Sequence, residues 1–120
     1  MHIVDTHCHA TPYWYEPIET LIYQMDQNEV DQAVLVQING QFDNTYQFEC
    51  EKRFPGRFVS VVIVDVDRPD APQQLEALVA KGARGVRLRP DMRSPGVDRR
   101  PRGSRTSCGS IRGPRRPPDR

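Results

Sequence analysis

Short apolar runs typical of β-strands alternate with helical patterns along residues 1–91, and this alternation constrains the fold more than any other feature. Strands that alternate with helices form a parallel sheet with right-handed crossovers. We therefore predict an α/β fold of order β-α-β-α-β-α-β. The expected strands cover residues 3–8, 33–37, 58–66 and 85–90, and the expected helices cover residues 18–28, 43–53 and a third segment that begins at 67–70 and ends near Gly82.

Apolar spacing and capping residues support these elements. Ile18, Leu21, Ile22 and Met25 recur at i, i+3, i+4 and i+7, which is one face of a helix. Residues 33–37 form a continuous apolar run, typical of a strand buried on both faces. The pattern also predicts Asp43 as an N-cap, Gly82 as a C-cap and an apolar stripe of Leu75, Leu78 and Val79 on the third helix.

The element order fits either an open doubly wound sheet or the N-terminal half of a (β/α)₈ TIM barrel. No G-x-G-x-x-G or G-x-x-x-x-G-K-[ST] motif follows a strand, so the phosphate-binding signatures of open sheets are missing. Functional side chains of a barrel lie at the C-terminal ends of its strands. His7 and His9 lie at such an end, which favours the half-barrel.

His7 and His9 are the candidate metal ligands. Strand side chains alternate between faces, so residues 7 and 9 are expected on the same side, where two imidazoles are suited to a divalent metal. Asp5 is expected on that side too, either orienting an imidazole or bonding to a neighbouring strand. Cys8 is expected to turn away and pack against a helix, which disfavours a Cys-His nucleophile.

Two arginines and an aromatic cluster are further candidates. Arg87 and Arg89 share one face of the expected fourth strand, where Arg89 is placed to hold a substrate carboxylate bidentately. The alternative is that both arginines are solvated or pair with acids such as Asp91. The aromatic run at residues 13–15 either lines a pocket or, as we favour, packs within its loop.

The charge changes sharply near residue 91. Residues 1–91 carry 8 Lys+Arg against 14 Asp+Glu, whereas residues 92–120 carry 9 Arg against 2 Asp and are mostly Arg, Pro, Gly and Ser. A segment with so few apolar residues is expected to be disordered. A basic arm and a solvated tail are two explanations, but no Lys and no aromatic residue is present for nucleic-acid binding. We favour a frame change, since alanine codons of a GC-rich gene read out of register encode Arg or Pro.

Other sequence features indicate the cellular location of the protein. No run approaches 18 apolar residues, and no basic region precedes an apolar core at the start, so neither a membrane span nor a signal peptide is expected. The three cysteines are odd in number and widely spaced, which favours a reducing cytoplasm over a disulfide framework.

Several segments together resemble a known family. The opening residues 3–9 (IVDTHCH) are similar to the first-strand motif of the amidohydrolase superfamily. The stretches 42–44 (FDN), 53–58 (RFPGRF) and 85–90 (GVRLRP) resemble its amidohydrolase-related (amidohydrolase 2) branch. That branch contains metal-dependent hydrolases, including lactonases for pyrone dicarboxylates, and some decarboxylases.

The resemblance implies a function and a partial site. His7 and His9 match metal ligands, usually of zinc, that activate water against a carbonyl of a small carbonyl or carboxylate substrate. A histidine and a catalytic aspartate of later strands complete such sites. A closed barrel takes about 250 residues, so we expect residues 1–91 to be a partial barrel domain and the 120-residue chain to be an inactive fragment. The alternatives are a TatD-like metal-dependent deoxyribonuclease fragment, disfavoured because residues 64–67 contain no histidine, and a non-catalytic, basic-tailed interaction protein.

Overall fold

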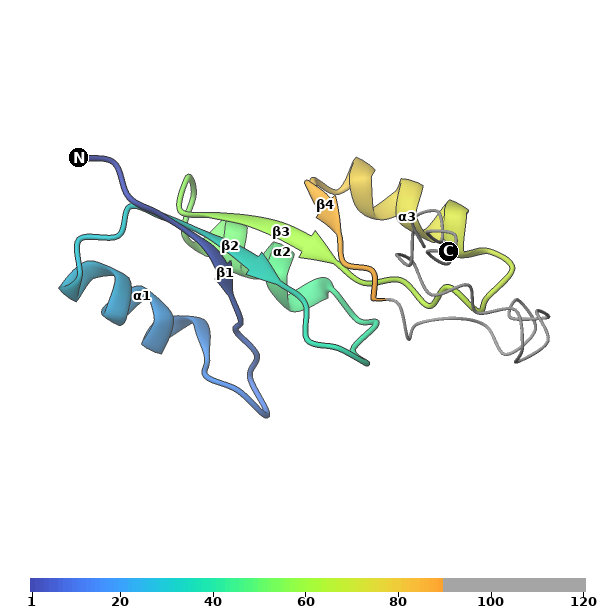
Figure 1. Cartoon of the computed structure of the whole chain (residues 1–120), viewed down its shortest axis with the longest axis horizontal. Helices are drawn as coiled ribbons and strands as arrows, with labels where there is room; N and C mark the ends of the chain where they lie inside the picture. The colour runs from blue at the N-terminus through green and yellow to red at the C-terminus, as the bar shows by residue number, and fades with distance from the viewer. Residues whose placement is uncertain (90–120) are drawn as a thin grey trace, which may run out of the picture.

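Four parallel strands and three helices alternate along residues 1–89, the part of the chain that the computed structural model describes (Figure 1). The strands lie in one sheet in the order β1-β2-β3-β4, so the predicted β-α-β-α-β-α-β fold is confirmed. The predicted boundary near residue 91 and the predicted disordered tail lie outside the described residues. The elements are β1 (Val4–Cys8), α1 (Ile18–Gln27), β2 (Gln32–Val36), α2 (Thr45–Arg53), β3 (Phe58–Val62), α3 (Ala71–Ala80) and β4 (Gly85–Val86).

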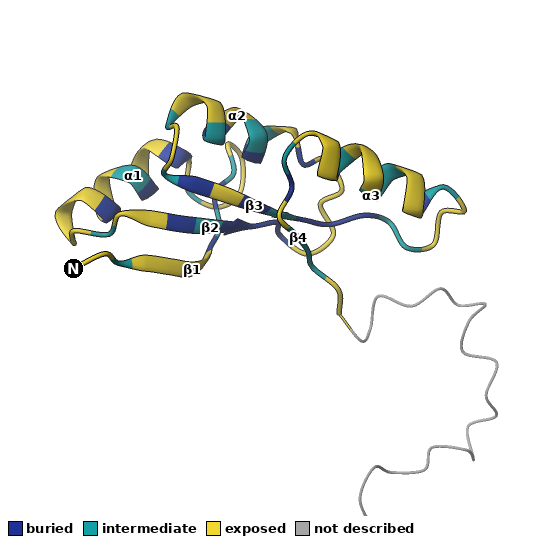
Figure 2. Ribbon diagram, turned by 90° about the horizontal axis from the view of Figure 1, so that it is seen from above, coloured by how far each residue is buried: buried dark blue, intermediate teal, exposed yellow. Residues whose placement is uncertain are grey.

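The helices all lie on the same side of the sheet, as Figure 2 shows. Each crossover leads to the next strand in the same direction, and consecutive right-handed crossovers of this kind keep their helices on one face. A doubly wound sheet reverses its strand order and carries helices on both faces. The arrangement is therefore that of a half-barrel, as the sequence predicted.

The core lies between α1, α2 and the sheet. Ile18, Leu21 and Met25 of α1 are buried against Ala33 and Leu35 of β2, which confirms the predicted apolar face of this helix. Removing such surface from water is the main favourable contribution to folding, about 25 cal/mol per Å² of apolar area. The same cluster includes Cys8, Ala10, Cys50 and Phe58.

Asn44 lies directly before α2, and its side chain also accounts for the end of β3. α2 begins at Thr45, so Asn44 occupies the cap position, one residue after the predicted N-cap Asp43; Asp43 Oδ1 nevertheless accepts from the backbone N–H of Thr45 (3.0 Å), the first of the helix. The side chain of Asn44 does not cap the helix; its Nδ2 donates to Ile63 O (2.9 Å) and its Oδ1 accepts from Ile63 N (3.1 Å). This amide takes up both backbone groups of Ile63, which explains why β3 ends at Val62 rather than at the predicted residue 66.

The last helix and strand differ most from the prediction. Leu75 and Leu78 are half-buried, but Val79 is 58% exposed, so the predicted stripe of α3 is narrower than expected. Strand β4 ends at Val86 rather than at residue 90, and among the described residues it pairs only with β3. β3 ends at Val62, which is in register with Val86, so the segment after Val86 has no ladder to extend.

The prediction that Gly82 ends the third helix is confirmed. Gly82 follows the cap residue Lys81 with a φ of +114°, a backbone conformation that favours glycine. Its N–H donates to Val79 O (3.0 Å), and the N–H of Ala83 donates to Leu78 O (3.0 Å). These two bonds form a Schellman motif, which satisfies carbonyls that the end of a helix leaves without partners.

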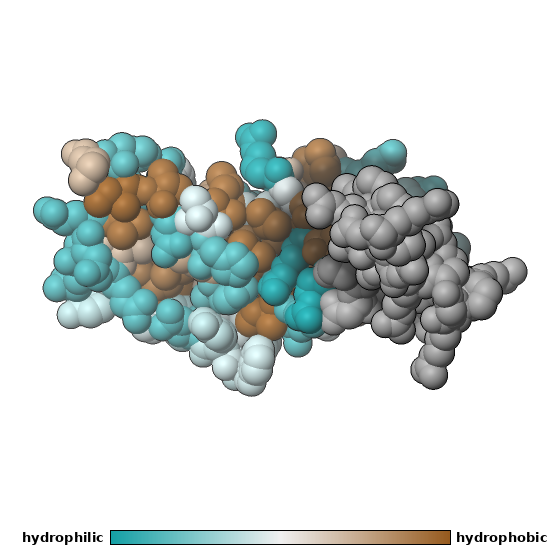
Figure 3. Space-filling view, in the orientation of Figure 1, coloured by the Kyte–Doolittle hydropathy of each residue, from teal (hydrophilic) through white to brown (hydrophobic). Residues whose placement is uncertain are grey.

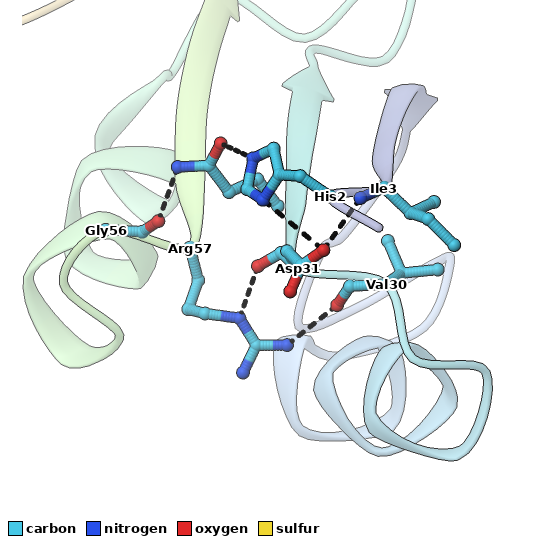
Figure 4. A network of polar contacts seen from close by, with 7 residues as sticks. His2, Ile3, Val30, Asp31, Gly56 and Arg57 are labelled. Carbon is cyan, nitrogen blue, oxygen red and sulfur yellow. Dashed lines mark hydrogen bonds and ion pairs between the residues drawn. The ribbon is translucent and has the colours of Figure 1, made fainter.

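A polar network joins the N-terminal ends of β1, β2 and β3 (Figure 4). Arg57 Nε donates to Asp31 O (2.7 Å) and its Nη2 donates to Val30 O (3.1 Å), while Asp31 Oδ2 accepts from Ile3 N (2.7 Å). His2 lies 3.4 Å from the same carboxylate. His2 therefore belongs to this network, at the opposite end of β1 from His7 and His9.

Candidate metal centre

His7 lies near the C-terminal end of β1 and His9 directly follows the strand; His7 is part of a β-bulge. Asp5 is in register with Ala33 and Cys8 with Leu35, so two residues of β1, Thr6 and His7, stand opposite the single residue Val34. Bulges of this kind occur at barrel rims and beside active sites, where they redirect side chains. Here the bulge moves the residues before it to the opposite face of the strand, whereas His7 and His9 stay on the same face as each other.

The two imidazoles face each other through their Nε2 atoms. These atoms are 3.2 Å apart, and the rings meet edge-on with centroids 4.9 Å apart. His9 Nδ1 lies 2.7 Å from the backbone carbonyl of Val36 at the end of β2. Because a carbonyl only accepts, Nδ1 of His9 carries the proton, and its Nε2 presents a lone pair when the ring is neutral.

This geometry suits a shared divalent ion. Two histidine nitrogens bound to one zinc at about 2.05 Å with tetrahedral angles lie about 3.3 Å apart, close to the observed separation of the Nε2 atoms. A ligating histidine usually donates its other ring N–H to a carbonyl or carboxylate, as His9 does to Val36. Residues 1–89 bring no third His, Cys, Asp or Glu into a metal-binding group with the pair.

Asp5 lies differently from the expected alternation. The bulge places Asp5 on the same side as Cys8, and its carboxylate accepts from the backbone N–H of His7 (3.0 Å) and from the Cys8 thiol rather than from an imidazole. The His7 amide is the main cause that lowers the pKa of Asp5, followed by the Cys8 thiol. Asp5 thus fixes the main chain of His7.

Cys8 is a buried thiol. It packs in the core cluster beside α1, as predicted, and is 8% exposed. Burial first, and then the hydrogen bond to Asp5, raises the pKa of Cys8 to about 12. At neutral pH Cys8 is therefore protonated, and neither a thiolate nucleophile nor a thiolate ligand is available at this position.

The two arginines of the fourth strand occupy different positions. Arg87 Nη1 donates to Gln37 O (2.8 Å), directly after β2, and the Arg87 side chain is partly buried. Arg89, the predicted carboxylate-binding residue, lies exposed beyond β4. The sequence placed both on one face but gave no sign that Arg87 reaches across β3 to β2. The register of a folded sheet is needed to see that contact.

The aromatic loop after β1 borders a small cavity. Thr11 Oγ1 accepts from the backbone N–H groups of the next aromatic residues, including that of Trp14 (3.1 Å). Tyr13 and Trp14 are 95% and 75% exposed and line a cavity of about 130 Å³ with Gln37 and Tyr46. Both residues thus border a cavity at the ends of β1 and β2, the alternative to packing within the loop, while Trp14 also packs edge-on against Tyr15 as favoured, with centroids 6.4 Å apart. Tyr15 instead contacts the His9 ring edge-on, with centroids 5.4 Å apart.

Solved structures share this fold. A probable 2-pyrone-4,6-dicarboxylic acid hydrolase from Acinetobacter baumannii, solved with citric acid bound, is 24% identical with a TM-score of 0.58, and the match covers 73% of this chain and 38% of that one. A protein from Agrobacterium tumefaciens, solved in its apo form, is 23% identical with a TM-score of 0.55, and the match covers 71% of this chain and 34% of that one. The chain thus spans little more than a third of either structure. None of the curated proteins matches it significantly.

The fold places this chain among proteins built on a TIM barrel, with a histidine pair at the C-terminal end of the first strand. The amidohydrolase family model matches residues 4–108, and the chain belongs to the amidohydrolase family. The match extends past residue 91, where the sequence predicted a boundary. None of the described helices is both long and apolar enough to span a bilayer.

Proposed function

We propose that this chain carries the first two metal ligands of a hydrolase that acts on small carbonyl or carboxylate substrates. The observation that carries the proposal is the 3.2 Å separation of the Nε2 atoms of His7 and His9, with His9 Nδ1 bonded to Val36 O. Membership of the amidohydrolase family supports a metal-dependent hydrolytic reaction. When bound, a metal such as zinc supplies an activated water and polarises a carbonyl group.

The residues of this chain have distinct roles in the proposal. His7 and His9 bind the metal through Nε2, Val36 O fixes the tautomer and orientation of His9, and Asp5 holds the backbone of His7. We propose that Arg89 binds a substrate carboxylate, since a guanidinium group binds carboxylates bidentately. The carboxylate class is supported by the A. baumannii structure, a probable 2-pyrone-4,6-dicarboxylic acid hydrolase with citric acid bound.

The proposal also concerns the activity of a single copy of the chain and the cellular compartment in which it lies. With only two ligands among residues 1–89, we expect a single copy of the chain to bind metal weakly and not to turn over substrate. Cys8 and Cys50 are buried free thiols, which supports a reducing cytoplasm.

Zinc titration tests the proposal. We expect His7→Ala and His9→Ala each to weaken zinc binding by about 100-fold or more, because each removes a ligand. The matched control is His2→Ala, which removes the histidine at the other end of β1 and should leave zinc binding unchanged. Equal affinities of all three variants would contradict the assignment. Hydrolysis of lactone and dicarboxylate substrates with added zinc tests the expected lack of turnover.

A further inference from the structure

The face of the sheet that the helices leave uncovered carries a group of valines. Its valines alternate with the core residues of the same strands, and we call Val4, Val34, Val59 and Val61 the valine face. Val4 and Val59 are 44% and 38% exposed, and the other two are half-buried. Figure 3 shows hydrophobic side chains gathered on this face over the first three strands. Such branched side chains fill the interior of a closed barrel.

Both edges of the sheet are unpaired within the described residues. β1 pairs only with β2, and β4 pairs only with β3, in the order β1-β2-β3-β4. An unpaired edge presents N–H and C=O groups that favour pairing with another chain. Four strands are too few to close into a barrel of this type, which takes eight.

The two edges carry opposite charge. Residues 1–31, which include β1 and α1, contain 6 Asp+Glu and no Lys or Arg, whereas residues 71–89, which include α3 and β4, contain 4 Lys+Arg against 1 Glu. Two of the six acids, Glu19 and Asp26, pair with arginines of the middle of the chain. Within residues 1–89, no ion pair involves Lys81, Arg84 or Arg87, the cations nearest β4. Complementary charge favours contact between the β4 edge of one molecule and the β1 edge of another, and like charge disfavours contact between identical edges.

We propose that two copies of this chain close into one eight-stranded barrel, in which β4 of each copy pairs in parallel with β1 of the other. The two contacts are identical under a twofold axis, so the assembly closes without leaving an edge. An interior of eight strands is just wide enough for side chains to fill, so the two valine faces pack against each other. Pairing with a second copy also gives residues 87–89 a strand partner, which extends β4 toward the predicted length.

Closure brings two histidine pairs together. All strands run in the same direction along the barrel, so His7 and His9 of both copies lie at one end and face each other across the axis. Four imidazoles complete a tetrahedral set for one zinc, with two ligands from each copy. This part rests on the proposed metal-binding role of His7 and His9, whereas the closed barrel itself does not.

Sedimentation of the full chain, with and without zinc, tests closure. We expect a species of two chains with one zinc per two chains. Val59→Lys places a charge in the barrel interior and should weaken dimerisation at least about tenfold, and Val4→Lys should do the same if Val59→Lys fails to fold. The matched control is Val79→Lys, which makes the same change at an exposed position of α3 and should leave the dimer intact.

Four outcomes separate this proposal from its alternatives. A monomer at all concentrations, or a dimer that neither face variant weakens, overturns the closed barrel. A monomer that Val59→Lys destabilises indicates that the chain's own remaining residues cover the valine face, and it also overturns the proposal. A monomer that binds zinc through His7 and His9 overturns the barrel but supports the proposed function. A dimer that Val59→Lys dissociates but that binds no zinc supports the barrel and overturns the metal site.

Discussion

His9 and Arg87, which directly follow the first and last strands of the sheet, hydrogen-bond to consecutive carbonyl oxygens of the chain at the end of β2. His9 Nδ1 lies 2.7 Å from Val36 O, and Arg87 Nη1 lies 2.8 Å from Gln37 O. The C-terminal end of β2 therefore orients a candidate metal ligand on one side and fixes a guanidinium group on the other. Through the end of β2, these two hydrogen bonds connect the histidine pair with the segment that follows β4 at the far edge of the sheet.

The bond of Arg87 should contribute to stability. We expect Arg87→Ala to lower the free energy of unfolding by about 1.5–3 kcal/mol, because it removes a partly buried hydrogen bond from a charged donor. Arg84→Ala is the matched control, since Arg84 is exposed and makes no ion pair among the described residues, and it should change stability by about 0.5 kcal/mol or less. Urea unfolding followed by circular dichroism measures both; equal losses would show that the contact contributes nothing.

Cys8 should be unreactive. A thiol whose pKa is raised to about 12 has almost no thiolate at pH 8, so alkylation should be far slower than in the unfolded chain. Iodoacetamide labelling in a Cys108→Ser background, read by peptide mass spectrometry, measures the rate with and without urea. Rapid labelling of folded Cys8 would refute the buried hydrogen bond to Asp5.

Asp5 should make the free energy of unfolding depend on pH in the acidic range. Its pKa is lowered on folding, so ionised Asp5 stabilises the protein above its ordinary value of 3.8, and that contribution is lost as the pH falls through the lower, folded value. Asp5→Asn lacks this contribution. We therefore expect the difference in unfolding free energy between the two proteins to be constant near neutral pH and to shrink below about pH 4. A difference that stays constant down to the acid end would contradict this.

Asn44 should be among the least replaceable polar residues. It is 4% exposed, and Asn44→Ala would leave the buried N–H and C=O of Ile63 without the partners that Asn44 provides. We expect a loss of about 2–4 kcal/mol. The control Asn28→Ala removes an exposed bond to Gln24 O and should cost less than about 1 kcal/mol. Thermal unfolding compares them, and similar melting temperatures would exclude a special role for Asn44.

Arg57 should stabilise the N-terminal ends of the strands. Arg57→Ala removes bonds to two carbonyls and to Asp26, so we expect a loss of about 2–3 kcal/mol. Arg68→Ala removes an exposed pair with Asp70, for which surface pairs suggest a loss below about 1 kcal/mol. Zinc binding should survive Arg57→Ala in the folded protein, because this network lies at the end of the sheet away from His7 and His9.

The fold could be read from the sequence because it depends on local periodicity. Ile18, Leu21 and Met25 mark a helix by spacing alone, and residues 33–37 mark a buried strand by composition. The histidine pair was visible for the same reason, since two residues apart on one strand share a face. The bounds at β3 and β4 were not visible, because a strand ends where its partner or a competing side chain ends its ladder.

Local sequence patterns therefore account for the order of elements, the amidohydrolase resemblance and the position of His7 and His9 at a strand end. Three features depend instead on the folded sheet: a bulge moves Asp5 to the side of Cys8, Asn44 bonds to Ile63, and Arg87 reaches Gln37. The physical reason is that hydrogen bonds between residues distant in the chain depend on register. A shift of one residue in a strand reverses which face every later side chain occupies.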